Sequence, residues 1–448
     1  MTVHATSALS EIVPRYTSYP TAPHFHTGIG ESDAKRWISQ LQSGNAVSLY
    51  VHIPFCDKLC WFCACHTKHT LHYKPVADFL VALHEEIRLV SSQLPSGVHV
   101  KAIHFGGGSP TMLRPHDLIH LVGMIRSSLH VDRTVALSVE IDPNDMDDHR
   151  LDALAVIGLT RASLGVQDFD PKVQNAINRM QSFELTKKVV EGLRARGAVS
   201  VNLDLLYGLP HQTVASVAET VRLALSLRPD RIALFGYAHV PWFKKHQTMI
   251  DEASLPDGEQ RFAQSRKAAS IIAKGGYDAI GIDHFALPDD SLSEAARRHR
   301  LHRNFQGYTD DGCETLIGMG PSSISRYRQG YAQNIIAAGE YEKAVHAGRL
   351  PVSRGIEFSR DDVATAWLIE RLMCDFEFSV EELVQQFGDC GQSLLAEAAR
   401  LARGEPDKLL LENDRFIVPA GQRPLVRTIA ARFDRYLHRG TARHSAAV

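Results

Sequence analysis

The sequence predicts an α/β fold in which a parallel sheet is covered by helices, followed by a smaller, mainly helical domain. From about residue 46 onward, short runs of β-branched and apolar residues alternate with longer segments of helical spacing. Past about residue 350 the pattern changes to helices. Strands that are nearly all apolar and alternate with helices indicate a parallel sheet, either doubly wound or a barrel, and periodicity alone does not distinguish the two.

The expected elements follow one another along the chain. Strands are expected at 46–55, 101–108, 136–142, 161–167, 201–208, 231–239 and 277–285. A helix is expected at 75–94, and in the C-terminal part a helix at 361–376, a short strand at "RFIVP" and a last helix near "PLVRTIAARFDRYL". We divide the chain into an N-terminal extension near the active-site mouth (1–45), an α/β domain (46–350) and a helical domain (351–448).

Composition excludes several classes of function. Hydrophobic residues at 44% and charged residues at 22% are ordinary for a folded chain. A formal net charge of −2 provides no basic field for nucleic acid or anionic membrane, so neither partner is expected. The first twenty residues lack the apolar core of a signal peptide, and no apolar stretch approaches the ~18 residues that span a bilayer. We therefore expect a cytoplasmic protein.

Four of the seven cysteines lie in the stretch "CDKLCWFCACH" (56–66). Cys56, Cys60 and Cys63 have the spacing C-x3-C-x2-C, directly after the first expected strand. Three thiolates in this arrangement suit a 4Fe-4S cluster, which would keep one iron without a protein ligand and therefore open for chemistry.

Two alternatives account for the same cysteines. Structural zinc could add Cys65, His66 and His69 as ligands, but such sites usually combine two ligand hairpins separated by a dozen or more residues. The second alternative is buried cysteines with no metal, but four thiols this close together in a cytosolic loop would invite oxidation.

Polar or glycine-rich residues come at the end of each expected strand or just after it. They are Cys56, Gly106 to Ser109, Glu140, Gln167, Asp204 and His239. Parallel α/β folds place their chemistry at the carboxyl ends of the strands, so we expect these residues to converge on one mouth. Glu140, in an otherwise apolar strand, needs a cation or hydroxyl donors as partners, and an ion pair with a neighbouring helix would satisfy it equally well.

The cysteine motif, with an aromatic residue before its last cysteine, resembles that of the radical SAM enzymes. "PRYTSYPTA", "YVHIPFC", "HFGGGSPT", "VEIDP", "GVQDF", "DLLYGLPHQT", "YAHVP", "GIDHFA" and "LHRNFQGYT" together resemble the oxygen-independent coproporphyrinogen III oxidases over essentially the full length. This resemblance implies a partial parallel (β/α) barrel of radical SAM type with a C-terminal mainly helical domain.

The resemblance also implies the reaction. The 4Fe-4S cluster would bind S-adenosyl-L-methionine and cleave it to a 5′-deoxyadenosyl radical. Two propionate side chains of coproporphyrinogen III would then be oxidatively decarboxylated to vinyl groups, giving protoporphyrinogen IX and consuming two S-adenosylmethionines. A radical suits this task because the hydrogen on the propionate β-carbon is unactivated and no side-chain base could remove it. The expected enzyme is a monomer that receives electrons from a protein such as flavodoxin or ferredoxin.

Site residues follow from motif matching. Cys56, Cys60 and Cys63 are the expected cluster ligands, and Cys65 matches a cysteine that is not a ligand. The residues expected to bind S-adenosylmethionine are Tyr50, Phe62, Gly107, Gly108, Ser109, Glu140, Gln167, Arg179, Asp204, Leu206, Ala238 and Ile324. No acid–base catalyst is assigned, because the radical comes from the cofactor.

A substrate with four propionates needs local cationic groups in a chain that is nearly neutral. Arg15 and Arg303 are the candidates, and Gln306 and Tyr308 accompany Arg303 in "RNFQGY".

A relative that binds or transfers haem without decarboxylase activity is the alternative function. It shares the three-cysteine motif and the glycine loop, whereas "PRYTSYPTA", Cys65 and "HRNFQGYT" favour the oxidase.

Overall fold

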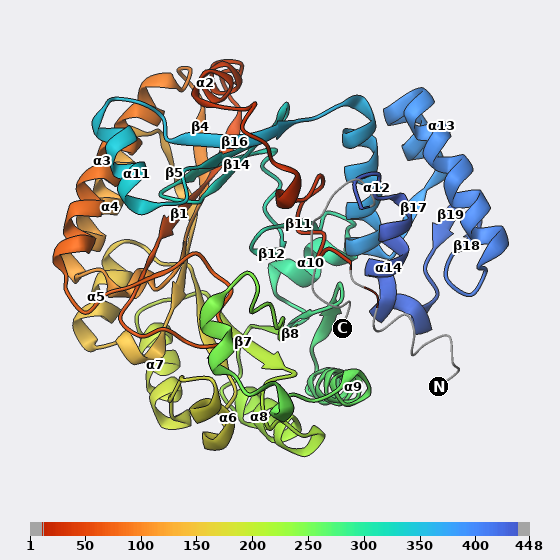
Figure 1. The fold of residues 1–448 in the computed structure, drawn as a ribbon, viewed down its shortest axis with the longest axis horizontal. Helices are drawn as coiled ribbons and strands as arrows, with labels where there is room; N and C mark the ends of the chain where they lie inside the picture. Colours follow the sequence, from red (N-terminus) through yellow and green to blue (C-terminus); the bar gives the residue numbers. More distant parts are fainter. Residues whose placement is uncertain (1–10, 12, 438–448) are drawn as a thin grey trace.

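A mixed sheet dominates the computed structural model, which describes residue 11 and residues 13–437; the rest of the N-terminal extension and of the C-terminal region lies outside the described residues. Six parallel strands form its centre in chain order: β1 (Ala46–Ile53), β4 (His99–Gly107), β5 (Val131–Ile141), β6 (Arg161–Gln167), β7 (Ser200–Tyr207) and β8 (Arg231–Gly236). Helices cover the outer face of this sheet (Figure 1): α3 (Lys74–Gln93), α4 (Pro115–Ser128), α5 (Asp148–Val156), α7 (Phe183–Ala195) and α8 (Val214–Ser226). The alternation is that of a partial parallel (β/α) barrel, as expected.

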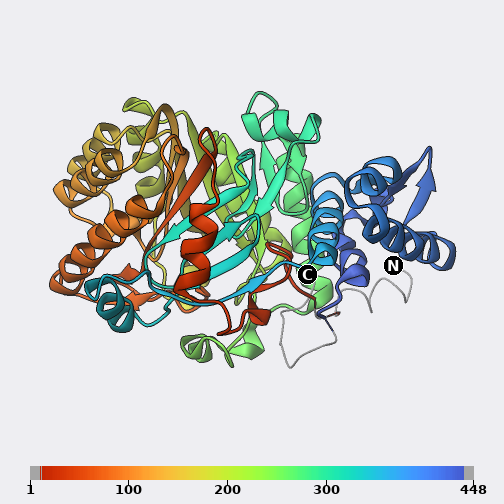
Figure 2. The ribbon, with the colours of Figure 1, turned by 90° about the horizontal axis from the view of Figure 1, so that it is seen from above.

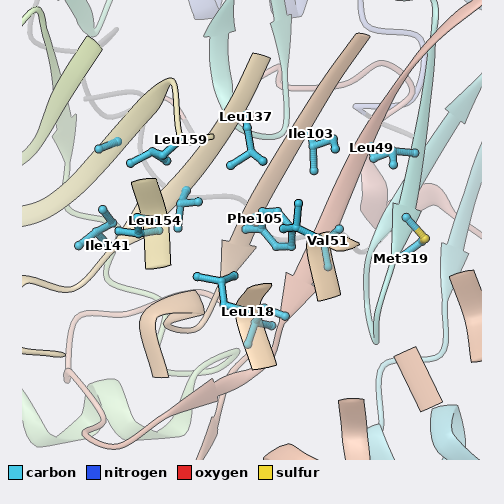
Figure 3. Close-up of a cluster of buried hydrophobic side chains, with 14 of the residues drawn as sticks. Leu49, Val51, Ile103, Phe105, Leu118, Leu137, Ile141, Leu154, Leu159 and Met319 are labelled. Atoms are coloured by element: carbon cyan, nitrogen blue, oxygen red, sulfur yellow. The ribbon is translucent and has the colours of Figure 1, made fainter. Parts of the chain in front are cut away.

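The main core lies between the parallel strands and these helices. Leu49 and Val51 of β1, Ile103 and Phe105 of β4 and Leu137 of β5 are each at most 1% exposed (Figure 3). Burial of one such side chain stabilises the fold by about 1.5–3 kcal/mol. The near-continuous apolar runs that predicted the strands therefore reflect a sheet buried on both faces.

The sheet continues on both sides of these six strands, and on the β1 side it does so with strands that the sequence did not reveal. On the β1 side it adds β13 (Thr315–Met319), which is parallel to β1, then the antiparallel strands β14 (Ile324–Tyr327), β15 (Gly330–Asn334) and β16 (Val352–Glu357). These strands are short, and β15 is buried throughout despite its polar residues, so no apolar alternation marks them. Because β16 ends at Glu357, the sheet extends beyond residue 350.

The strand expected at 277–285 is wrong as a single element. The chain forms β9 (Asp278–Ile280) and β10 (His284–Ala286), which pair antiparallel with each other, and β10 pairs antiparallel with β8. Gly281, at φ +57°, begins the turn between them. Asp283 in this turn becomes a wall residue of a cavity described below.

The C-terminal region has its own core. It contains α12 (Arg360–Asp375), α13 (Val380–Gly404), α14 (Val426–Ala430) and the small sheet of β17 (Glu377–Ser379), β18 (Leu410–Glu412) and β19 (Arg415–Ile417). Phe378 and Phe416 stack at its centre. The last helix is shorter than expected, because Pro424 cannot donate a helical hydrogen bond and the chain leaves helical geometry at Asp434 (φ −78°, ψ 105°).

The N-terminal segment runs between the two regions (Figure 2). Arg427 of α14 donates to the carbonyls of Val13 (2.8 Å) and Pro14 (3.1 Å), and the hydroxyl of Tyr16 donates to Asp434 (3.0 Å). The segment thereby reaches the rim of the sheet before α2 (Glu31–Ser39) begins. Among the described residues, no helix has the length and apolar character required to cross a membrane.

Candidate active site

The three motif cysteines lie on one loop between β2 (Phe55–Cys56) and β3 (Lys68–His69), just past the carboxyl end of β1. Other segments hold this loop by hydrogen bonds to its backbone. Asn178 donates to the carbonyl of Leu59 (2.9 Å), and Gln247 donates to that of Phe62 (2.9 Å). A loop fixed from both sides presents its thiols in a preorganised arrangement.

The thiols fit a cluster better than a single ion. All three cysteines are free and partly buried, and each thiol interacts electrostatically with the other two. Within the described part of the chain, no three His, Cys, Asp or Glu side chains lie close enough to hold one metal ion. Burial raises the pKa of the Cys56 thiol, whereas a hydrogen bond with Cys65 lowers the pKa of Cys63 to about 7. Three free, partly buried thiols on one short stretch of chain are the donor set that a 4Fe-4S cluster uses.

The glycine loop after β4 lies directly against the start of the cysteine loop. Gly108 N donates to the carbonyl of Ile53 (2.8 Å), and Ser109 N donates to that of Phe55 (2.7 Å). A Cβ on Gly108 would stand 2.4 Å from the Phe55 oxygen, and one on Gly107, at φ +113°, would meet the ring of His52 at 2.6 Å. Only glycine allows this approach. The Ser109 hydroxyl is not free, because it donates to Asp145.

Glu140 joins this loop to the neighbouring strands. Its carboxylate accepts from Gly107 N (3.1 Å) and pairs with His104 Nε2 (3.1 Å), and the ring of Tyr50 stacks on His104. Burial alone would raise the pKa of Glu140, but these hydrogen bonds and the charge of His104 lower it, so the group is an anion at neutral pH. The ion pair foreseen with a helix is instead a pair with a histidine on the adjacent strand.

Arg179 connects the cysteine loop to β5 and β6. Its guanidinium donates to Asp142 (2.8 Å), to the carbonyl of Gly165 (2.6 Å) and to the sulfur of Cys60 (3.4 Å), while its Nε is buried without a partner among the described residues. A Cβ on Gly165 would meet both Gln167 (3.1 Å) and Arg179 (3.2 Å). A buried donor without an acceptor indicates space for a polar ligand group here.

Asp204 lies on β7 beside this group. It accepts from Ser163 (3.1 Å) and Asn202 (2.7 Å), and burial, followed by the charge of Glu140, raises its pKa to about 6. A buried carboxyl group beside the anion of Glu140 is stabilised by hydroxyl donors or by a cation.

The other residues expected at the cofactor surround the same mouth. Phe62 and Leu206 pack on one apolar cluster with Tyr237. Ala238 follows β8, and its carbonyl accepts from Gln247, which also holds Phe62. The carbonyl of Ile324 lies against Gly318, the strand neighbour of Tyr50. The geometry thus gathers the expected cofactor residues from β1, β4, β5, β6, β7, β8 and β14.

A cavity of about 950 Å³ opens beside Ala238, between the sheet and the helical region. Arg15 and Arg303, the two arginines expected to contact the substrate, both line it. Gln306 and Tyr308 are not on its wall. Tyr308 donates its hydroxyl to the carbonyl of Met373 (2.6 Å) and supports Arg303, whose guanidinium carbon lies 4.3 Å from its ring centre.

Sequence reasoning missed four arginines on this cavity, among them Arg261 of α9 (Gly258–Lys274) and Arg427 of α14. Each is an arginine on a helix with no motif around it, and such residues are normally solvated. The low exposure of Arg427, 7%, becomes apparent only in the fold.

Comparisons with known proteins agree with this geometry. Residues 50–224 match the family model of the Radical SAM superfamily. An oxygen-independent coproporphyrinogen III oxidase of Paracoccus denitrificans is 47% identical over 97% of this chain and 96% of its own length, and one of Bradyrhizobium diazoefficiens is 45% identical over 99% of both. The solved coproporphyrinogen III oxidase of Escherichia coli, described as a radical SAM enzyme, superposes with a TM-score of 0.90 at 36% identity, covering 95% of this chain and all of that one.

Full-length similarity at this level, together with a three-cysteine loop and a glycine loop at the carboxyl end of the sheet, places the chain plainly: it belongs to the oxygen-independent coproporphyrinogen III oxidase family of radical SAM enzymes.

Proposed function

We propose that this protein oxidatively decarboxylates two propionate side chains of coproporphyrinogen III, giving protoporphyrinogen IX and two molecules of carbon dioxide. The observation that carries the proposal is the position of the arginine-lined cavity, which opens beside Ala238 at the mouth that also holds the cysteine loop. A tetrapyrrole with anionic side chains in this cavity would meet arginines on a wall that also includes Ala238, one of the expected cofactor residues.

The cluster and S-adenosylmethionine, when bound, supply a 5′-deoxyadenosyl radical that removes a hydrogen atom from the propionate β-carbon. Cys56, Cys60 and Cys63 would hold the cluster, and Gly107 and Gly108 would admit the methionine end of the cofactor to the backbone. These residues bind and orient the reacting groups.

The charged residues have separate tasks in this proposal. Arg179 would pair with the methionine carboxylate, and Glu140 and Asp204 would accept hydrogen bonds from the ammonium or ribose hydroxyl groups.

Each decarboxylation releases carbon dioxide and one electron, which passes to an acceptor, and forms one vinyl group. Two propionates therefore require two S-adenosylmethionines.

The proposal extends to partners and organisation. A monomer in the cytoplasm would receive electrons from a reducing protein such as flavodoxin or ferredoxin. We also propose the division into an N-terminal extension, a catalytic α/β domain and a helical domain that closes the substrate cavity.

Anaerobic reconstitution tests this function. The protein is loaded with iron and sulfide, reduced, and mixed with S-adenosylmethionine and coproporphyrinogen III, and products are separated by chromatography. Formation of 5′-deoxyadenosine and protoporphyrinogen together supports the oxidase. Deoxyadenosine without vinyl product, combined with tight haem binding, would instead favour the haem-binding alternative.

A further inference from the structure

The cavity beside Ala238 is lined by arginines from several segments that lie far apart in the sequence. Four of its arginines come from distant segments: Arg15 from the N-terminal segment, Arg261 from α9, Arg303 from β11 (His302–Asn304) and Arg427 from α14. Folding alone brings them together, at the junction between the sheet and the helical region. Like charges from four segments would not be gathered in one place for stability, because they repel one another.

The carboxylates on the cavity wall do not neutralise this charge. Asp257 and Glu259 lie exposed in the first turn of α9, where Asp257 caps the helix by accepting from Gln260 N (2.8 Å). Asp283 is the remaining one, and it pairs with both His284 (2.7 Å) and Arg303 (3.4 Å). One inner carboxylate, shared with a histidine, therefore faces four guanidinium groups.

Several guanidinium donors in the group lack an acceptor. Nε of Arg261, and Nε and Nη1 of Arg303, are buried and find no hydrogen-bond partner within residues 13–437. Arg303 is only 7% exposed. Buried unsatisfied donors on charged groups are costly, and a carboxylate is the acceptor that satisfies a guanidinium best.

Backbone contacts fix the positions of these side chains. Arg261 donates to the carbonyl of Tyr237 (2.7 Å), and Arg15 donates to that of Gly236 (2.9 Å). A Cβ on Gly208, at φ +81°, would stand 2.7 Å from the Arg261 guanidinium, so glycine makes room for this arginine. Arg15 and Arg261 are thus held in place by neutral carbonyls, and these contacts do not neutralise their charge.

Burial and the mutual repulsion of these positive charges both lower the pKa of Arg427. Burial, followed by the neighbouring charges of Arg15 and Arg303, lowers the pKa of its guanidinium to about 9. Burial also lowers the pKa values of Arg15 and Arg261. An anion placed among these groups would relieve the repulsion.

We propose that Arg15, Arg261, Arg303 and Arg427 form an anion site that binds propionate carboxylates of the substrate which are not reacting, and so orients the reacting propionate toward the cysteine loop. The inference rests on the proposed function for the identity of the ligand. The requirement for an anionic ligand follows from the site itself.

Binding without turnover tests this site. Coproporphyrin III, with four carboxylates, and mesoporphyrin IX, with two, are titrated into the reconstituted protein and followed by fluorescence. The variants are Arg15→Gln and Arg261→Gln, since glutamine keeps a donor for the backbone carbonyl and removes the charge. Arg222→Gln is the matched control, because Arg222 is an exposed residue of α8 paired with Glu219.

The proposed site predicts that each cavity variant weakens coproporphyrin III binding by about 10-fold or more. The preference for four carboxylates over two should shrink, while the iron and sulfide content of the reconstituted protein stays at the wild-type level. Unchanged affinity in both cavity variants, or an equal loss in Arg222→Gln, would overturn the inference.

The two proposals fail separately. If the reconstituted wild-type protein forms no vinyl product but the variants still lose porphyrin affinity, the anion site is supported and the oxidase function is refuted. If turnover proceeds with an unchanged KM in Arg15→Gln and Arg261→Gln, the oxidase function stands and the anion site falls.

Discussion

The guanidinium of Arg179 lies 3.4 Å from the sulfur of Cys60 while it pairs with Asp142 at 2.8 Å. One buried side chain thus links a cluster ligand to the end of β5. Arg179 is 8% exposed, so its charge is screened little by solvent.

Arg179→Gln should therefore affect both stability and cofactor binding. Loss of the charge leaves Asp142 without its cation, and the free energy of unfolding should fall by roughly 3 kcal/mol. Affinity for S-adenosylmethionine, measured by equilibrium dialysis, should fall about 10-fold or more. Arg196→Gln, which breaks pairs with Asp148 and Asp152 at the surface, should cost at most about 1 kcal/mol and leave cofactor affinity intact. Equal effects in the two variants would contradict the role given to Arg179.

The cysteines can be separated by their roles. Cys60→Ser should reconstitute with little iron and form no 5′-deoxyadenosine, because three thiolates are needed to hold the cluster. Cys65→Ser should retain the iron and sulfide content of the wild type. Iron and sulfide analysis with visible absorption checks both variants, and a Cys65 variant without iron would show that the ligand assignment is wrong.

Close packing of the glycine loop predicts a steric effect. Gly108→Ala would place a methyl group 2.4 Å from the Phe55 carbonyl oxygen, so backbone must shift, at a cost of about 1–3 kcal/mol. The displaced loop should also bind S-adenosylmethionine more weakly. Gly123→Ala, in α4 with open space around it, should be neutral or stabilising by up to about 1 kcal/mol. Thermal unfolding of both variants, with cofactor binding, measures the contrast, and equal Tm values for the two would refute it.

Glu86 predicts a pH dependence of stability. This carboxyl, 1% exposed, accepts from Gly320 N (2.7 Å), Asn334 (2.7 Å) and the hydroxyl of Tyr341 (2.6 Å), and burial raises its pKa to about 7. The folded state therefore holds a proton that the unfolded state releases near pH 4.5. Stability should fall as pH rises from about 4.5 to about 7, by roughly 3 kcal/mol at most.

Glu86→Gln should remove this slope, since an amide does not titrate. Glu85→Gln, which alters the neighbouring half-buried residue that pairs with His346, should keep the wild-type slope. Denaturant unfolding across the same pH window compares the three proteins. A slope in Glu86→Gln equal to that of the wild type would assign the pH dependence to other groups.

Sequence patterns predicted the parallel part of the fold well because those strands are buried on both faces. The strand expected at 161–167 coincides with β6, Arg161–Gln167, and the helix expected at 75–94 with α3, Lys74–Gln93. The sequence did not predict the strands β13 to β16, because they are short and partly polar. Their residues are buried by packing and show no apolar alternation.

The candidate site divides in the same way. Cysteine spacing and glycine runs are local in sequence, so Cys56 and Gly107 could be recognised from motifs. Arg261 and Arg427 could not be recognised in this way, because they line a cavity whose wall is built from several distant segments and no local sequence pattern marks them. Tyr308 shows the opposite case, since its motif suggested contact with substrate whereas its hydroxyl binds the backbone of Met373.

Transfer of hydrogen from substrate to cofactor is the most direct test of the central claim. Coproporphyrinogen III carrying deuterium at the propionate β-carbons is turned over anaerobically by the reconstituted protein, and the 5′-deoxyadenosine is examined by mass spectrometry. The account predicts one deuterium in the deoxyadenosine, formed together with vinyl product. Deoxyadenosine that contains no deuterium while protoporphyrinogen accumulates would contradict it.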